Sequence, residues 1–296
     1  MNPIQKRRGF TTIELLVVIA IMAVLAAMIY AAINRVRTQQ FMVTTQSDIR
    51  EFELALEEFK GRYGMYPPSS ITVGTSKGAI PASDYTILTT IWPSIDLSQA
   101  FGASGMQSGT YRLKGDQCLV LFLGGLHDQR GCVGFSTNPQ NPFEADTNKP
   151  DRKQPLFKFK PERLHQREAG KPFFSYGDGW FGQMFKDKTT GKVGQSVTCY
   201  AYFSAQKGVY ADTDCDRQTD RDGTGNFPHP FRHPTKKDAF NNLVWVNPNS
   251  FQIISAGADT FFGGATMWAP NDNSDVGKNP TSTDNVTNFS GGILGS

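Results

Sequence analysis

An uninterrupted apolar stretch dominates the beginning of the chain. Residues 15–33 read LLVVIAIMAVLAAMIYAAI and contain no charged side chain. A helix of this length is long enough to cross the roughly 30 Å hydrocarbon layer of a bilayer. The pattern therefore predicts a membrane-spanning helix. Three consecutive cations in front of it, Lys6, Arg7 and Arg8, are expected to hold that end in the cytoplasm.

Beyond the apolar stretch the pattern becomes amphipathic. Apolar side chains recur every three or four residues, at Ile49, Phe52, Leu56, Phe59 and Tyr63. This is the period of one helix face, so we expect a continuous helix that is apolar over residues 10–33 and amphipathic over residues 34–64. From Phe10 to Lys60 it would measure about 75 Å at about 1.5 Å per residue. Residues that disfavour helix follow, at Gly61, Gly64, Pro67 and Pro68.

The rest of the chain, residues 65–296, predicts an exported globular head of a different kind. Gly, Pro, Asn, Thr and Ser become frequent, and the apolar runs become short. Four windows predict β-strands: Cys118–Leu123, Val197–Phe203, Asn242–Val246 and Phe251–Ser255. A long helix followed by strands predicts an α+β fold with an antiparallel β-sheet. Long loops are expected between the strands, above all over residues 124–195.

The balance of charge argues against nucleic-acid binding. The chain has 30 Lys and Arg against 27 Asp and Glu, and the three cations at residues 6–8 account for the difference. Binding to nucleic acid draws most of its affinity from clustered Lys and Arg, so no nucleic-acid partner is expected. We also find no nucleophile elbow and no phosphate-binding loop. The sequence therefore predicts no catalytic residue and no enzyme.

Four cysteines lie outside the apolar stretch, at Cys118, Cys132, Cys199 and Cys215. Disulfides persist in an exported domain, and four cysteines allow three pairings. We favour bridges between neighbours in sequence, Cys118 with Cys132 and Cys199 with Cys215, over four unpaired buried thiols. No two of them have Cys-x-x-Cys spacing, which argues against a structural zinc site.

The junction before the apolar stretch carries the most specific signal. It reads KRRGFTTIE over residues 6–14. An ordinary secretory signal peptide has a shorter apolar region that ends in an Ala-x-Ala site, which this chain lacks. The junction instead resembles the prepilin peptidase site of type IV pilins and type II secretion pseudopilins. The resemblance implies a leader peptide over residues 1–9, cleavage between Gly9 and Phe10, and N-methylation of Phe10.

Glu14 is the ionisable residue close to the start of the apolar stretch. A carboxylate among lipid tails costs about 2.5–3.5 kcal/mol, so it needs a partner. In the resembling family this partner is the N-terminal amine of a neighbouring subunit, which implies that Glu14 directs assembly. The alternative is a side chain that reaches back to the lipid headgroups.

Two segments near the C-terminus carry a second resemblance. They read FQIISAGADTFFGG over residues 251–264 and DNVTNF over residues 284–289. They resemble the loop with which major type II secretion pseudopilins bind calcium, a cation that prefers carboxylate and carbonyl oxygens. The resemblance implies calcium ligation by Asp259 and Asp284, with Asn285 and Asp275 as further candidates. Thr260 stands where that family has Gly, and a surface loop rich in Asx turns is the alternative.

A third acidic stretch, residues 212–223, gathers five carboxylates. Arg217 and Gly223 occupy the sixth and twelfth positions, where a calcium-binding EF-hand loop requires Gly and Glu. We therefore favour a solvated acidic loop over a second ion site.

Together the resemblances imply a structural subunit, either a pseudopilin or a pilin-like protein. Its filament would belong to a type II secretion or a type IV pilus-like machine. The N-terminal helix would sit first in the inner membrane, with its N-terminus cytoplasmic and the head periplasmic. The implied partners are the prepilin peptidase, other pilin or pseudopilin subunits in a homo- or heteropolymer, the inner-membrane assembly platform, and lipid before assembly. The alternative is a pilin-anchored adhesin or substrate-binding protein whose enlarged head does the work.

Overall fold

The computed structural model describes residues 10–101, 109–128, 130–146, 151–167, 170–186, 193–215, 227–272 and 274–295. The leader with Gly9, and residues 216–226 of the acidic stretch, lie outside the described residues. The chain divides into two compact units, Met1–Val43 and Thr44–Ser296.

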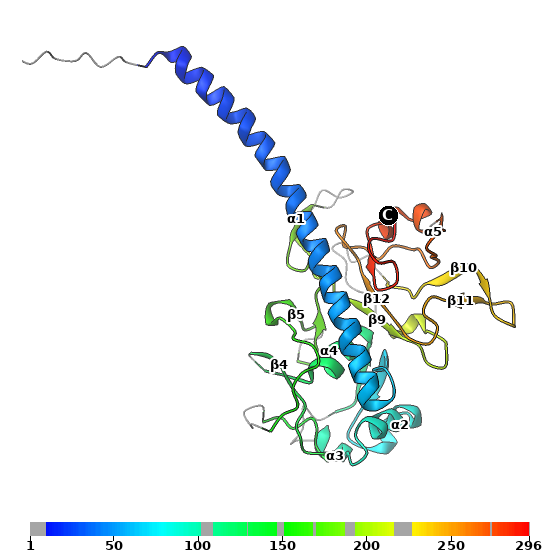
Figure 1. The fold of residues 1–296 in the computed structure, drawn as a ribbon. Helices are drawn as coiled ribbons and strands as arrows, with labels where there is room; N and C mark the ends of the chain where they lie inside the picture. The colour runs from blue at the N-terminus through cyan, green and yellow to red at the C-terminus, as the bar shows by residue number, and fades with distance from the viewer. Residues whose placement is uncertain are drawn as a thin grey trace, which may run out of the picture. The chain divides into compact units, whose positions relative to one another are not determined.

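One long helix and several short ones make up the helical part of the described chain (Figure 1). The α-helices are α1 (Thr12–Tyr63), α2 (Ala82–Ile91), α3 (Leu97–Ala100), α4 (Gly115–Gly124) and α5 (Ser274–Lys278). The predicted unbroken N-terminal helix is confirmed by α1. It ends as the glycines indicated, because Gly64 adopts the left-handed conformation at a φ of 75° and its N–H donates to the Lys60 carbonyl at 2.8 Å.

The strands are short, and all of their ladders are antiparallel. They are β1 (Ser70–Val73), β2 (Tyr111–Lys114), β3 (Leu126–Asp128), β4 (Gly131–Gly134), β5 (Leu164–His165), β6 (Ser175–Tyr176), β7 (Met184–Lys186), β8 (Val193–Gln195), β9 (Ala201–Ser204), β10 (Arg232–Lys237), β11 (Leu243–Trp245), β12 (Phe251–Ser255) and β13 (Val286–Thr287). Among the described residues they form a three-stranded sheet, in the order β13-β12-β9, and five two-stranded ladders. The α+β class is confirmed.

The strand predicted over Cys118–Leu123 is wrong, because these residues lie in α4. Every residue of α4 is buried, and the run Cys118–Leu123 is apolar throughout, so this run shows neither the period of a strand nor that of a helix. Its start is stabilised locally, since the Lys114 N–H donates to Gln117 Oε1 at 3.2 Å. Burial within the head therefore decides the conformation of this segment.

The other three windows predicted as strands each contain a strand, over all or part of their length. Phe251–Ser255 is β12, and the window Asn242–Val246 contains β11. Of the window Val197–Phe203, only the part from Ala201 onward forms a strand. The region expected as a long loop, residues 124–195, contains the hairpins β3–β4, β5–β6 and β7–β8.

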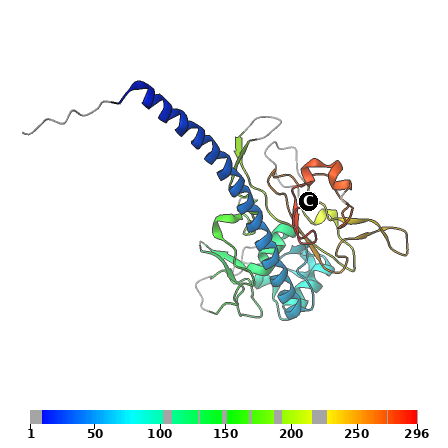
Figure 2. The same cartoon turned by 45° about the horizontal axis from the view of Figure 1, so that its top comes forward.

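The amphipathic part of α1 buries the face that its periodicity predicts. Ile49, Phe52, Leu56 and Phe59 are buried, and Phe52 lies at the centre of a group of aromatic rings. Its ring stacks on Phe157 with centroids 4.2 Å apart and meets the Tyr200 ring edge-on at 5.3 Å. In both views the β13-β12-β9 sheet lies on one side of this part of α1, and β4 and β5 lie on the other (Figures 1 and 2).

A second core lies behind the three-stranded sheet. Its buried members come from β9, β12 and the C-terminal region, and include Phe203, Phe231, Ile254, Phe262, Trp268 and Leu294. The end of the chain is thus packed into the head, and this packing positions the C-terminal loop that contains Asp259 and Asp284.

Candidate functional site

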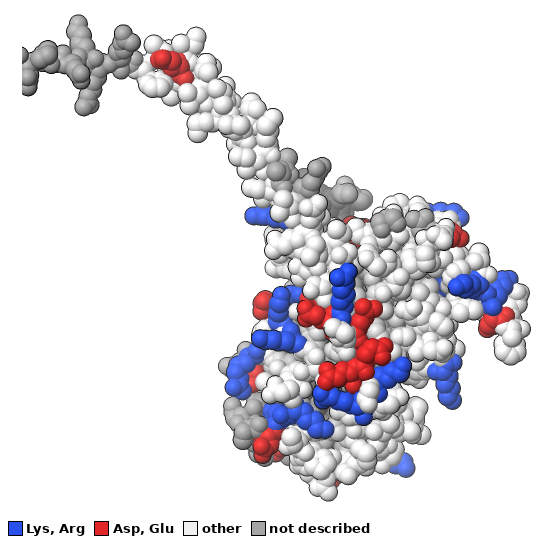
Figure 3. Space-filling model, viewed as in Figure 1, with Lys and Arg blue, Asp and Glu red and all other residues white. Residues whose placement is uncertain are grey.

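The first half of α1 exposes its apolar side chains. The segment Thr12–Tyr30 has a mean hydropathy of 2.7, and none of it is buried within the protein. Figure 3 shows this part of the helix without Lys or Arg, and with acidic atoms only near its start. A continuous apolar surface of this size requires lipid or another protein to cover it. Its length and composition fit a membrane anchor.

Glu14 forms a reciprocal cap with Thr11 at the start of α1. Its Oε2 accepts hydrogen bonds from the Thr11 N–H at 2.9 Å and from the Thr11 hydroxyl at 2.6 Å. In return, the Glu14 N–H donates to Thr11 Oγ1 at 3.3 Å. This arrangement is a capping box, which satisfies donors that the first helical turn leaves unpaired. The spacing Thr-x-x-Glu could have revealed this cap, but the sequence analysis considered Glu14 as an assembly residue or as a side chain that reaches the lipid headgroups.

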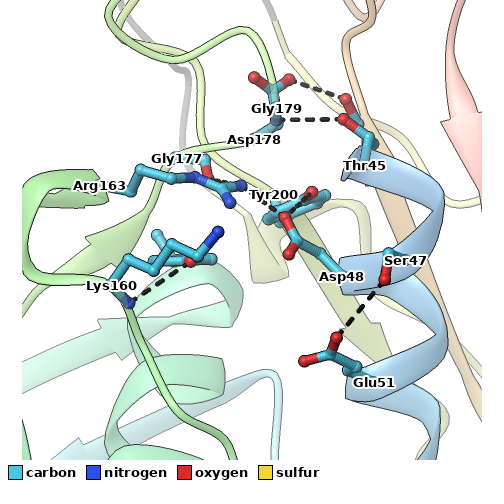
Figure 4. A network of polar contacts seen from close by, with 12 residues as sticks. Thr45, Ser47, Asp48, Glu51, Lys160, Arg163, Gly177, Asp178, Gly179 and Tyr200 are labelled. Atoms are coloured by element: carbon cyan, nitrogen blue, oxygen red, sulfur yellow. Dashed lines mark hydrogen bonds and ion pairs between the residues drawn. The ribbon is translucent and has the colours of Figure 1, made fainter. Parts of the chain in front are cut away.

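A buried ion pair joins the second half of α1 to the head (Figure 4). Asp48 Oδ2 accepts from Arg163 Nη2 at 2.6 Å and from the Tyr200 hydroxyl at 2.9 Å. Arg163 also donates through Nε and Nη2 to the Gly177 carbonyl, at 3.0 and 2.6 Å, and lies over the Tyr176 ring. Removing one partner of such a pair leaves a buried charge without compensation, which is strongly destabilising.

The polar network continues from α1 to β12. Thr45 Oγ1 accepts from the Gly179 N–H at 3.1 Å (Figure 4). Next to it, the buried Asp178 accepts from the Trp180 N–H at 3.0 Å and from the Ser255 hydroxyl at 2.7 Å. Burial raises the pKa of Asp178 to about 7, and the hydrogen bonds from Ser255 and Trp180 oppose this rise. Sequence reasoning missed this network because its members are far apart in the chain.

The C-terminal loop brings two of the predicted calcium ligands together. The Asp259 N–H donates to Asp284 Oδ2 at 2.8 Å. The Asn285 side chain donates through Nδ2 to the Phe262 carbonyl at 2.7 Å, and its buried Oδ1 accepts no hydrogen bond within the described residues. Thr260 has a φ of 69°, in the left-handed region where the resembling family has Gly. Thr260 therefore adopts a backbone conformation that its own branched side chain disfavours.

The other predicted ligand, Asp275, serves a different turn. Its Oδ2 accepts from the N–H groups of Thr266 and Met267, at 2.9 and 3.0 Å. No group of three or more His, Cys, Asp or Glu side chains that could hold a metal ion occurs in the described part of the chain. A cation at this loop would thus need backbone or amide oxygens besides Asp259 and Asp284.

The four cysteines are free thiols in this structure, and the two pairings expected from the sequence stay predictions. They lie against different neighbours. Cys132 packs at the end of α4, where a Cβ added to Gly124 would lie 2.7 Å from its Sγ. The Cys199 thiol is oriented toward the Val197 carbonyl at 3.6 Å.

Comparison with known families identifies the N-terminal segment. Residues 4–30 match a family model described as the prokaryotic N-terminal methylation motif. Neither the curated proteins nor the solved structures gave a match. The matched residues contain the junction at Gly9 and Phe10, the cap formed by Thr11 and Glu14, and most of the exposed apolar helix.

Proposed function

We propose that this prepilin-type protein is a structural subunit of a filament, a pseudopilin or pilin-like component of a type II secretion or type IV pilus-like machine. The observation that carries the proposal is the methylation motif over residues 4–30, which includes the apolar helical segment Thr12–Tyr30 with no buried residue. Such a helix is stable in lipid. In a filament, the helices of neighbouring subunits would cover it instead, since apolar helices associate through close side-chain packing.

Processing would precede assembly. A prepilin peptidase would cut between Gly9 and Phe10 on the cytoplasmic face and leave the apolar helix in the inner membrane. Phe10 would then become the methylated N-terminus. The cations at residues 6–8 favour a cytoplasmic leader, which places the head on the other side of the membrane.

Glu14 would have two roles in this scheme. Its cap on Thr11 uses Oε2, and the carboxylate offers a second oxygen, Oε1. In the filament we expect this carboxylate to pair with the amine of Phe10 of a neighbouring subunit. A charge that is costly in lipid would then favour the assembled state, because assembly supplies the opposite charge.

The first test is replacement of Gly9 by Leu in the full-length chain. We expect the wild-type protein from its native membrane to begin at methylated Phe10, and the G9L protein to keep Met1 while remaining in the membrane. Insertion depends on the apolar stretch, which the substitution leaves intact. Intact mass and terminal sequencing report both results.

Gly61→Ala provides the matched control, since a Cβ added to Gly61 meets no atom within 4 Å. It should be processed like the wild type. Normal cleavage of G9L, or a wild-type N-terminus at Met1, would contradict the assignment as a prepilin.

We also propose that the C-terminal loop binds one calcium ion. The backbone of Asp259 donates to the Asp284 carboxylate, and the buried Asn285 Oδ1 next to Asp284 accepts no hydrogen bond from the described residues, so the two halves of the loop lie side by side. Calcium requires about six to eight oxygens, and backbone carbonyls of the loop would supply the remainder. The ion would tie residues 257–262 to the last segment of the chain.

A further inference from the structure

Two buried thiols converge on the first turn of α4. A Cβ added to Gly115 would lie 2.9 Å from Cys215 Sγ, so this thiol packs against the helix at Gly115. Cys118 lies three residues later, on the same face of the helix. Side chains of a helix lean toward its N-terminus and cover the preceding turn, which here is the turn of Gly115. The two sulfur atoms are therefore both directed toward the backbone at Gly115.

The pKa of Cys118 is consistent with this placement. Burial raises the pKa of Cys118 well above its ordinary value, and the negative charges of Asp116, Asp214 and the Cys215 thiolate raise it further. Cys215 Sγ also donates to the Tyr202 carbonyl at 3.3 Å, which holds it beside β9. The other two thiols lie elsewhere, Cys132 at Gly124 and Cys199 at Val197.

We propose that Cys118 and Cys215 form a disulfide bond in the mature protein. The inference rests on the proposed function, which places the head in an oxidising compartment. Each thiol loses its proton, one S–S bond forms, and the two electrons reduce a disulfide-bonded thiol oxidase or a small-molecule disulfide to two thiols. The weak hydrogen bond from Cys215 to Tyr202 is lost in exchange.

The bridge would join the buried helix to a distant part of the chain. Cys118 lies near the start of α4. Cys215 follows the short turn Asp212–Asp214, in which Asp214 accepts from the Ser69 hydroxyl at 2.6 Å. The strands β3 to β9 all lie between the two cysteines in the sequence. A disulfide that closes a loop of this length restricts the unfolded chain strongly.

Burial also determines when the bridge forms. Both thiols are buried in the folded protein, and burial raises the pKa of Cys215 as it does that of Cys118. Thiol exchange proceeds through the accessible thiolate, so these two react slowly once the head has folded. The bridge is therefore expected to form during folding, and refolding is the direct way to observe it.

The test uses the full-length chain in detergent micelles. The protein is reduced, denatured and refolded with a mixture of reduced and oxidised glutathione. It is then labelled with N-ethylmaleimide under denaturing conditions and digested without reductant. We expect label on Cys132 and Cys199, and a linked pair of peptides that contain Cys118 and Cys215. Four labelled cysteines, or another linked pair, would overturn the inference.

Two sets of variants keep the result independent of folding defects. C132S/C199S retains the proposed pair and should carry no label after refolding. C118S and C215S should each leave three labelled cysteines. A C132S/C199S protein that folds but labels at both remaining cysteines would overturn the proposal even if the single variants failed to fold.

A second measurement separates this inference from the proposed function. The intact mass of the protein from its native membrane reports cleavage before Phe10 and, after labelling, the number of free thiols. An uncleaved, fully reduced native protein together with a bridged refolded protein would contradict export and support the pairing. A cleaved native protein with four free thiols would overturn the pairing.

Discussion

The two halves of α1 share one backbone and differ in what surrounds their side chains. Over Thr12–Tyr30 the helix is apolar and buries nothing, whereas the part from Thr44 onward buries a face with Phe52 at its centre. The second half is held by aromatic rings and by the ion pair of Asp48 with Arg163. Association with other molecules is thus left to the first half, while the second half holds the head.

Each half of α1 has a carboxylate with hydrogen-bond partners, and the two carboxylates differ in exposure and in where those partners come from. Glu14 is exposed, and its cap comes from Thr11 within the same turn. Asp48 is buried, and its partners Arg163 and Tyr200 come from far along the chain. A carboxylate on an exposed surface remains accessible to a second molecule, whereas one in a satisfied buried network does not.

The largest effect should follow from Glu14→Val in the first half of the helix. The variant should insert into the membrane as well as the wild type, because Val is more compatible with lipid. Its incorporation into the filament should be lost, since the partner of the neighbour's N-terminal amine is gone. Co-purification with wild-type subunits, after cross-linking in membranes, measures this.

Thr11→Ala is the matched control, because it removes the hydroxyl that makes two of the three hydrogen bonds of the cap and keeps the Glu14 carboxylate. If T11A assembles and E14V does not, the carboxylate acts between subunits. Equal loss in both variants would show that capping of the helix is the whole role of Glu14.

In the second half, Phe52→Ala should destabilise the head by about 3–5 kcal/mol, the range for a large aromatic residue removed from a packed core. Leu54→Ala is the control on the same helix, because Leu54 is 73% exposed, and it should change stability by less than about 0.5 kcal/mol. Urea unfolding of the full chain in detergent, followed by tryptophan fluorescence, compares the two. Similar losses in both variants would contradict the packing described for α1.

Asp178 should make the head less stable as the pH rises. Burial raises its pKa from 3.8 to about 7, so between these values the folded state binds more protons than the unfolded state. The contribution of Asp178 to the free energy of unfolding is fully present below pH 3.8. It falls as the pH rises toward 7 and stays low above pH 7. From pH 5 to pH 8 the loss should be roughly 2–3 kcal/mol.

Asp178→Asn should remove this dependence, because an amide cannot ionise. Denaturant unfolding of both proteins at pH 5 and pH 8 gives the comparison. If the wild type and the variant change equally between the two pH values, Asp178 does not titrate near neutrality.

The smallest effect concerns the C-terminal loop. Calcium that binds only the folded state should stabilise it by RT ln(1 + [L]/Kd), about 1.4 kcal/mol at tenfold Kd. The full chain should therefore melt at a higher temperature in calcium than in a chelator. Asp259→Ala and Asp284→Ala should abolish this difference, whereas Asp275→Asn should lower stability in both conditions and leave the difference intact. If the melting temperature of the wild-type protein is the same in calcium and in a chelator, the loop does not bind calcium.

Patterns that repeat over short distances determined much of this protein. The span and amphipathic face of α1 follow from apolar spacing, and its end follows from Gly64, because side-chain periodicity and backbone conformation are local properties. The junction at Gly9 and Phe10 is equally local, which is why residues 4–30 match the methylation motif without the rest of the chain.

Only the tertiary structure decided what depends on distant contacts. The segment of α4 is a helix because the head buries it on every side, and its short apolar run alone does not distinguish helix from strand. The pair of Asp48 and Arg163 joins residues 115 positions apart. The left-handed conformation of Thr260 likewise comes from its place in the packed C-terminal region, since its own side chain disfavours it. In each case the outcome depends on burial and on contacts between residues far apart in the chain. A short window of sequence does not contain both partners of such a contact.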